Sequence, residues 1–563
     1  MLQSNSTFIA IAVAIFLAGC AGLGSMEKAL NTVGLSVQPE TLILQGGNVE
    51  VTITGNFPAK YFGKKVILEA TPVLMWEGGE AAFETEGFQG EEAAGNYSVV
   101  SYEVGKSFKY TASIPYQSAM EDASHLELRI RGKKGDSVVD FEPYFLCKGV
   151  ITTPNLVQPD DKFMITADNF QRTRSYTHND KINYDYNSSV VKSGEVKTDE
   201  WSAMRELFIL AASADSVTLT GVTIDAYASP EGEISLNKDL ASDRANSAYN
   251  ALQRELRRAR IKLGNDFANL VAKGEDWDGF KKLMQASDIA DKDLIIRVLE
   301  MYADNNKREE EIRNIAKTYE EIEDRILPSL RRSTISLDYT VEGYTDEELI
   351  DLCMSAPETL TVEELLYSAT LFDDVNEKYT IYSSCASIHS SDLRGHNNSG
   401  VCLMEMGRRN QAKEAFNKAN SLDANNKAVL NNLGAIARQE GRTDDAESLL
   451  AKAGSSAETS YNKGLVAITR GNYGSAISSM SGSTSVNLAL AKLLNGDANG
   501  AKTTLKNSND ESAIASYVLA ICCARLDDAV GAKSNIDDAL TKDSSLNAKA
   551  KADLEFDGID LGL

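Results

Sequence analysis

A stretch near the middle of the chain carries polar and charged side chains of the kinds that hold ligands. Residues 225–245 read DAYASPEGEISLNKDLASDRA, which predicts a strand, a Pro-Gly turn and a helix that carries Arg244. Ser229-Pro230-Glu231-Gly232 fits a β-turn with proline at its second position. An asparagine such as Asn237 near a helix start usually caps the helix or shapes the turn. Two interpretations stay open: a ligand-binding loop, or a strand-turn-helix joint in which Arg244 pairs with neighbouring carboxylates.

The second residue with evident chemistry is Cys20. It ends the apolar run FIAIAVAIFLAGC, which is shorter than a membrane-spanning helix and suits the core of a signal peptide. Leu17-Ala18-Gly19-Cys20 resembles a bacterial lipobox, in which the cysteine receives lipid and becomes the first residue of the mature protein. We therefore expect acyl chains on Cys20 to hold the protein to a bilayer. An ordinary cleaved signal or a buried N-terminal strand is the alternative, because MLQSNST contains no Lys or Arg.

The residues that follow Cys20 bear on the side of the membrane that the protein faces. AGLGSMEKALNTVG has no aspartate directly after the cysteine and no acidic run of the kind that marks surface-exported lipoproteins in some Bacteroidota. We therefore expect a lipid anchor in the outer membrane, with the body of the protein on the periplasmic side.

Composition argues against several partners and chemistries. The formal net charge of −25 disfavours nucleic acid and an anionic lipid surface as the main partner. The 4 histidines are scattered, and the cysteines after Cys20 show no CxxC or His-paired spacing. We therefore expect no metal, no cofactor and few or no disulfides. No Ser-His or Cys-His arrangement supports an enzyme such as a wall hydrolase.

The expected fold class is multidomain, because three segments of the 563 residues differ in periodicity. Short alternating strands such as NVEVTITGNF predict an immunoglobulin-like β-sandwich over 34–150. Alternating strands and helices over 151–345 predict a two-layer α/β domain with a charged helical insertion at 262–328. The remaining segments are a signal peptide at 1–20, linkers at 21–33 and 346–359, a helical repeat array at 360–552 and a tail at 553–563.

Two local signals refine the α/β segment. Thr198 precedes the amphipathic stretch DEWSAMRELFILAASAD and is a suitable helix N-cap. In SVTLTGVTIDAYAS the apolar alternation slips at Gly221, which predicts a β-bulge at that residue.

The C-terminal segment repeats itself. Gly400 and Gly434 are 34 residues apart, and so are Phe416 and Leu450. A helix-turn-helix period of about 34 residues with small residues at such offsets resembles the tetratricopeptide repeat. Small residues let the two helices of a repeat approach closely, while Phe416 or Leu450 fills the gap to the next repeat. The resemblance implies an all-α solenoid whose concave face binds an unknown protein partner. A purely architectural role is the alternative.

The opening stretch also resembles a known family. AYASPEGEISLNKDLASDRANSAYNAL and RRSTISLDY are similar to the OmpA C-terminal-like family, whose periplasmic domain binds peptidoglycan. OmpA-like proteins of Bacteroidota share the SPEG, GEDW and LRR elements found here. Against the family pattern Asn-x-x-Leu-Ser-x-x-Arg-Ala, this chain has Asn237, Leu240, Ala241, Arg244 and Ala245, and Arg331-Arg332 matches the start of the last strand.

The resemblance implies capture of the free zwitterionic end of diaminopimelate in the peptidoglycan stem peptide. In the family an aspartate takes the ammonium, and an arginine takes the carboxylate through two parallel hydrogen bonds. Arg244 stands at the arginine position, whereas Ser229 replaces the aspartate. Either Glu231 substitutes from the turn, or affinity is lowered or lost. The implied peptidoglycan-binding residues are Arg244, Asn237, Ser229 and Glu231.

The expected function is that of a non-enzymatic outer-membrane lipoprotein. Its OmpA-like domain would tether a membrane assembly to peptidoglycan, while its repeats hold a protein partner. The alternative is a protein-docking scaffold in which the OmpA-like domain no longer binds peptidoglycan.

Overall fold

The computed structural model describes residues 22–563 except 122, 263 and 265, so Cys20 and the expected signal peptide lie outside the described residues. The chain forms two compact units: Met1–Ala167 together with Phe372–Leu563, and Asp168–Leu371. In the described part of the chain, no helix combines the length and apolarity needed to cross a membrane.

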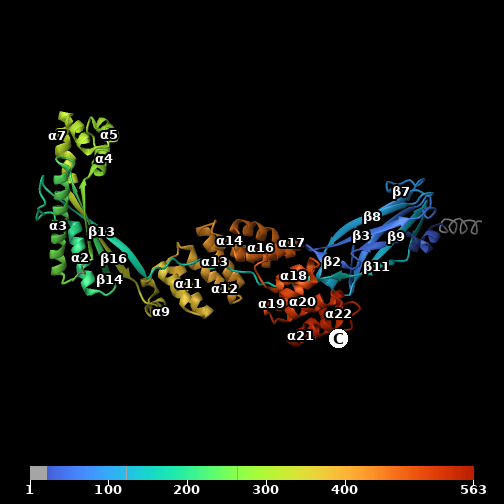
Figure 1. The fold of residues 1–563 in the computed structure, drawn as a ribbon. Helices are drawn as coiled ribbons and strands as arrows, with labels where there is room; N and C mark the ends of the chain where they lie inside the picture. Colours follow the sequence, from blue (N-terminus) through green and yellow to red (C-terminus); the bar gives the residue numbers. More distant parts are fainter. Residues whose placement is uncertain (1–21, 122, 263, 265) are drawn as a thin grey trace, which may run out of the picture. The chain divides into compact units, whose positions relative to one another are not determined.

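The N-terminal part consists of two β-sheets that face each other (Figure 1). Its strands are β1 Ser36–Gln38, β2 Leu42–Gln45, β3 Asn48–Phe57, β4 Ile67–Trp76, β5 Gly79–Ala82, β6 Glu86–Gly90, β7 Ser98–Val100, β8 Lys106–Pro115, β9 His125–Lys134, β10 Ser137–Asp140, β11 Tyr144–Lys148 and β12 Val150–Ile151. One sheet has the order β1-β3-β2-β12 with β8 beside β3; the other has the order β10-β9-β4-β6-β7 with β11 beside β9 and β5 beside β4. Alternation along β3 turns Val49, Val51 and Ile53 toward Leu74 and Leu126 of the facing sheet. The expectation of a β-rich N-terminal region is confirmed.

The segment expected as a linker at 21–33 is part of this packed core over its described residues. Residues 22–28 are helical and are followed by the 3-10 turn η1, Leu30–Val33. Leu23 and Met26 are buried in the same cluster as residues of both sheets. Apolar side chains at helical spacing account for the difference, because they bury one helix face against the sandwich.

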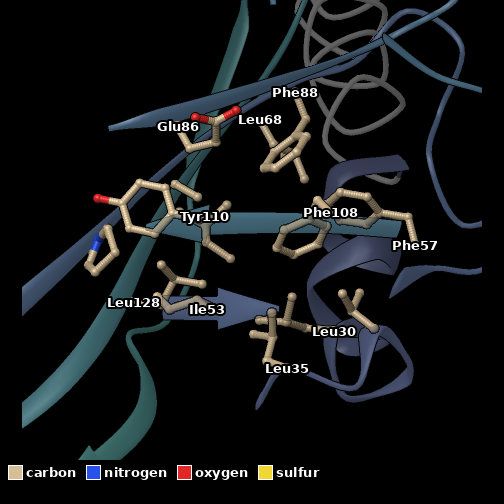
Figure 2. Close-up of a pocket in the computed structure, with 14 residues that line it drawn as sticks. Leu30, Leu35, Ile53, Phe57, Leu68, Glu86, Phe88, Phe108, Tyr110 and Leu128 are labelled. Carbon is tan, nitrogen blue, oxygen red and sulfur yellow. The ribbon is translucent and has the colours of Figure 1, made fainter. Parts of the chain in front are cut away.

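A small apolar cavity lies between the two sheets (Figure 2). Phe57, Phe88 and Phe108 line it, with Tyr110 and Glu86 at its edge. Its volume is about 40 Å³, whereas ligand pockets usually exceed about 300 Å³. The cavity is therefore a packing gap in the core and not a binding site.

The second unit is built on a four-stranded sheet with the order β13-β16-β14-β15. Its elements are β13 Thr173–Asn183, α2 Asp199–Ser213, β14 Val217–Ala228, α3 Ile234–Arg258, β15 Ala268–Glu275 and β16 Arg332–Glu342. Strand β14 runs parallel to β15 and antiparallel to β16. Helices α2 and α3 bury Trp201 and Leu252 against Ile224 and Ile335 of the sheet. Thr198 caps α2 by accepting a hydrogen bond from Trp201, and the register of β14 shifts at Gly221, so both local predictions are confirmed.

The segment between α3 and β16 differs from the expected helical insertion at 262–328. Its first part is strand β15, which continues the sheet beside β14. The remaining elements are α4 Trp277–Ala286, α5 Lys292–Met301, α6 Asn305–Arg313, α7 Ala316–Arg325 and α8 Leu327–Leu330, followed after β16 by α9 Asp346–Ser355 and α10 Val362–Ser368. Phe280, Met284 and Ile295 form a separate core within α4 to α8. The expected linker at 346–359 is largely helix α9, which a Thr345–Glu348 capping box begins.

The C-terminal array is all helical, as expected. Its helices are α11 Val375–Ile388, α12 Leu393–Glu405, α13 Arg409–Leu422, α14 Lys427–Gln439, α15 Thr443–Ala453, α16 Ala457–Thr469, α17 Tyr473–Ser479, α18 Val486–Leu494, α19 Ala498–Ser508, α20 Ala513–Ala524, α21 Ala529–Lys542 and α22 Leu546–Ala552. A Cβ on Gly400 would lie 2.6 Å from the Phe416 ring, and one on Gly434 would lie 2.8 Å from Leu450 Cγ. These glycines are required because the second helix of each repeat packs directly on the first.

Gly434→Val tests this helix packing. The added side chain overlaps Leu450, so we expect the free energy of unfolding to fall by about 1–3 kcal/mol, measured by calorimetry on the full chain. Gly474→Ala is the control, because a Cβ there would meet nothing within 4 Å. An unchanged melting profile for Gly434→Val would contradict the close helix contact.

Candidate functional site

An extended segment of the chain itself lies along the repeat array. We call residues 157–167 the strap; they follow the 3-10 turn η3, Thr153–Leu156, and have no regular secondary structure. This segment was expected to belong to the α/β domain at 151–345, whereas its contacts are with α12, α14, α16 and α18, the first helices of successive repeats. The difference arises because these contacts lie far apart in sequence and leave no periodic signal in the segment.

Asparagine side chains hold the main chain of the strap. In each pair a backbone N–H donates to Oδ1 at 2.7 to 2.8 Å, and Nδ2 of the same asparagine donates to the carbonyl of the same strap residue at 2.8 to 3.0 Å. The pairs are Gln158 with Asn487, Lys162 with Asn462, Met164 with Asn432 and Thr166 with Asn398. An extended residue presents its N–H and C=O to one side, so alternate strap residues can pair this way.

A second set of asparagines links these pairs to one another. Asn431 donates to the carbonyl of Lys162 at 2.8 Å, and Asn397 donates to that of Met164 at 2.9 Å. Asn462 also donates to Asn431, and Asn432 donates to Asn397, both at 3.0 Å. The array asparagines of both sets, which we call the asparagine ladder, are at most 1% exposed. Because a buried amide without partners is costly, the ladder and the strap stabilise each other.

Side chains of the strap make a few selective contacts. The Asp161 carboxylate is fully buried, and Arg438 binds it with Nε at 2.6 Å and Nη2 at 2.5 Å while Gln439 donates at 2.8 Å. The Phe163 ring lies parallel to that of Phe416, with centroids 6.1 Å apart. These contacts fix the register of the strap, because the ladder bonds are the same for any residue except proline.

Asp160 lies beside the ladder and engages its neighbours through its side chain. Tyr461 donates to Asp160 Oδ2 at 2.6 Å, and Asn487 donates to Oδ1 at 2.6 Å. Burial, and then the Asp160 carboxylate, raise the pKa of Tyr461. Tyr461 therefore stays a neutral donor across the physiological pH range.

The ladder was not predicted, although the sequence contains a signal for it. Asparagine stands two residues before the small residue of each first helix, in HNNSG, LNNLG, YNKG and VNLA. The expected partner site on the concave face of the array is occupied in this structure by residues of the same chain.

The residues predicted to bind peptidoglycan lie together in the second unit, between the end of β14 and the first turns of α3. Arg244 is 1% exposed, and its guanidinium donates to the carbonyls of Ser188 at 2.9 Å, Tyr227 at 2.8 Å and Asp185 at 3.3 Å. It also lies over the Tyr184 ring at 5.1 Å. Burial lowers the pKa of Arg244 to about 10, so the side chain stays charged at neutral pH.

Glu231 in the turn forms a buried ion pair with Arg331, which is distant in sequence. Arg331 Nη2 lies 2.9 Å from Glu231 Oε1, and Nε donates to the Ser229 hydroxyl at 3.3 Å. Ser229 in turn donates to Glu231. Arg331 was noted in the sequence as a strand-start residue only; the sheet brings it to the turn because β16 lies next to β14.

Asn237 lies inside α3 rather than at its cap. It donates to the carbonyl of Glu231 and to Glu275 Oε1, both at 3.0 Å. It therefore shapes the turn and ties it to the end of β15. The bond to Glu231 agrees with the turn-shaping role considered for this asparagine.

The cluster in the second unit contains a buried pair of opposite charges, Glu231 and Arg331, which lie side by side. The segment that contains Asp185 and Ser188 covers Arg244. Arg244 can contact a ligand only if that segment moves. No group of His, Cys, Asp and Glu able to hold a metal ion occurs among the described residues.

Comparison with known proteins identifies the class of the C-terminal region. The family model described as the tetratricopeptide repeat matches residues 393–426. No curated protein matches the chain. Among solved structures, pilF of Pseudomonas aeruginosa is 15% identical with a TM-score of 0.30, covering 37% of this chain and 97% of that protein. A tetratricopeptide repeat protein from Parabacteroides merdae is 16% identical with a TM-score of 0.29, covering 37% of this chain and 89% of that protein.

The repeat match places a tetratricopeptide region after the β-rich region, as the 34-residue period predicts. Repeats of this class are non-enzymatic protein-interaction modules. The matched residues 393–426 include α12 and α13, and therefore the ladder residues Asn397 and Asn398.

Replacing ladder asparagines should release the strap. We expect the double variant Asn432→Ala, Asn462→Ala to be cleaved by trypsin after Lys162 at least about tenfold faster than wild type, because each lost pair costs about 1–3 kcal/mol. Mass spectrometry of the fragments measures the rate. Asn417→Ala is the matched control, an exposed asparagine on α13. Equal rates for both variants would show that the ladder does not hold the strap.

The Glu231–Arg331 pair makes a separate prediction about stability. Arg331→Met leaves the Glu231 carboxylate, 5% exposed, without its partner. We expect the free energy of unfolding to fall by about 3–5 kcal/mol, seen as a lower melting transition in calorimetry. The double variant Glu231→Gln, Arg331→Met should recover much of that loss. A melting profile that Arg331→Met leaves unchanged would argue against a buried pair.

Proposed function

We propose that this protein is a non-enzymatic scaffold in which the repeat array clamps the segment that joins the β-sandwich to the α/β unit. The observation that carries the proposal is the asparagine ladder on the backbone of the strap. A free linker of this length samples many conformations, at about 1–2 kcal/mol of entropy per residue ordered. The ladder bonds offset that cost and hold the strap on the array, within the first unit.

Contacts at the C-terminal end of the array support the same role. Lys148 lies 2.6 Å from Asp557, and Lys549 pairs with Glu121, so the sandwich contacts the last helices directly. Thr153 donates to Glu555, which Arg525 also binds. The expected tail at 553–563 is thus part of the attachment, with Phe556 buried. Strap and tail together hold the sandwich on the array.

A cut inside the chain tests the clamp. A recognition sequence for a site-specific protease, inserted after Ala167, allows the N-terminal fragment to be severed from the α/β unit. We expect the fragment to stay bound to the array and to co-elute with it in gel filtration, because the ladder bonds and the tail contacts remain. Separation of the fragments of the otherwise wild-type protein would overturn the proposal.

We also propose the outer membrane, on its periplasmic side, as the location of this scaffold. The lipobox-like sequence ending at Cys20 supports the anchor. The helical residues 22–28 pack into the sandwich, so an acylated Cys20 would leave little slack between bilayer and sandwich. Labelling cells with a radioactive fatty acid tests this: wild type should carry label, and Cys20→Ser should carry none.

A second candidate function is peptidoglycan binding by the α/β unit. The convergence of Ser229, Glu231, Asn237 and Arg244 at one turn favours it. In this hypothesis Glu231 takes the ammonium of a diaminopimelate end in place of the missing aspartate. Arg331, and Arg244 once uncovered, then bind the carboxylate.

A pull-down on purified peptidoglycan distinguishes the candidates. If the wall is bound, wild type should be retained and both Arg244→Ala and Glu231→Gln should lose at least about tenfold in retention, since each removes one charge contact. Arg254→Ala on the exposed face of α3 is the control. If wild type is not retained at low salt, peptidoglycan binding is rejected and only the scaffold function remains.

A further inference from the structure

The ladder grips a bound chain without regard to most of its side chains. Its hydrogen bonds go to the N–H and C=O groups of alternate residues, which every extended peptide without proline at those positions presents. The same face could therefore hold an extended segment from another protein in the same way. What limits the choice of segment is the small number of side-chain contacts.

Besides Asp160, which binds Tyr461 and Asn487, two strap positions supply that selectivity. Asp161 is matched by the planar fork of Arg438 and by Gln439, an arrangement suited to a carboxylate. Two residues later, Phe163 stacks on Phe416. An acidic residue followed at the second position by an aromatic residue is thus the pattern that the face recognises. Ile165 is 49% exposed, so the next position on that side of the strap imposes little.

The strap does not fill the space available to it. A hollow of about 530 Å³ lies beside Asp161 and Phe163, lined on the array side by Val401, Met404 and Arg409. Its lining is mixed, with the apolar Val401 and Met404 beside the charged Glu405 and Arg409. A larger aromatic side chain than phenylalanine would bury more apolar surface there. Such a ring would add contacts that the strap does not make.

A segment that replaces the strap must take over its bonds to the ladder. Any extended backbone without proline at the paired positions can do so, because the amides bind only N–H and C=O groups. Exchange is opposed by the tether, which gives the strap an effective concentration on the order of millimolar. A partner segment that fits the hollow better can overcome that advantage.

We propose that the face of α12, α14 and α16 is a binding site for an extended partner segment with an acidic residue two positions before a bulky aromatic one. The strap is its built-in competitor. The proposal rests on the scaffold function, because it takes the strap in the groove as the resting state. Partner binding would then release the strap, residues 157–167, from the array.

Fluorescence anisotropy with a labelled peptide tests the site. The probe is QPDDKFMITA, the sequence of residues 158–167. The proteins are the full mature chain and its variant Asp161→Ala, Phe163→Ala, in which the strap keeps its backbone bonds and loses its selective contacts. We expect saturable binding to the variant and at least tenfold weaker apparent binding to wild type, whose intact strap competes better.

Matched peptides test the recognition pattern in the same variant. QPDNKAMITA, which lacks the charge and the ring, should bind at least tenfold more weakly than QPDDKFMITA. A peptide with tryptophan in place of phenylalanine should bind at least as tightly as the parent, because of the hollow. Adding Arg438→Met to the variant should abolish the preference for aspartate over asparagine.

Each result decides a separate point. No binding to a variant whose circular dichroism matches wild type, or equal binding of all peptides, overturns the site. Equal binding to wild type and variant overturns the competitor role of the strap. If the peptides do not bind but wild type resists trypsin after Lys162, the binding site is wrong and the scaffold function is still supported. Rapid wild-type cleavage there shows instead that the scaffold itself is wrong.

Discussion

The pairing of asparagine side chains with a backbone is the interaction on which the organisation of the first unit depends. A primary amide carries one acceptor and two donors, so a single side chain can satisfy the N–H and C=O of one extended residue. The array repeats this device along its first helices, and the chain supplies the backbone that the amides need. Without the ladder, residues 157–167 would be a flexible linker, and without the strap the ladder amides would lack their backbone partners.

The ladder extends over repeats of unequal length. The ladder asparagines are 34, 30 and 25 residues apart, from Asn398 to Asn432, Asn462 and Asn487. At the last step, Pro159, which has no N–H, and then Asp160 and Asp161 lie between Gln158, paired to Asn487, and Lys162, paired to Asn462. The side-chain carboxylate of Asp160 there replaces a backbone contact.

The second unit follows a different principle, balance of buried charge. Glu231 and Arg331 form an ion pair, and hydrogen bonds to backbone carbonyls stabilise the charge of Arg244. Desolvation makes an unpaired charge at this turn costly, so each residue is held by the others.

Much of the local structure could be predicted from the sequence because it depends on neighbours along the chain. The Thr198 cap, the bulge at Gly221 and the close approach of the repeat helices at small residues each follow from residue type and spacing along the chain. The contact of Leu450 with Gly434 of its own repeat was not predicted, because Leu450 was expected to fill the gap to the next repeat. Strand β15 was hidden inside a charged excursion, because a short strand at the edge of a sheet has a weak pattern of its own. The carboxylate partner of Arg331 was equally out of reach, since 100 residues separate it from Glu231.

The sequence by itself determined the classes of element: a β-rich start, an α/β middle and a helical repeat with its small residues in place. The tertiary structure alone decided what the repeats hold. Every residue except proline has a backbone N–H and a C=O group. A segment that binds through these groups, as the strap does, therefore has no distinctive sequence pattern. Only the meeting of Lys162 with Asn462, 300 residues away, identifies it.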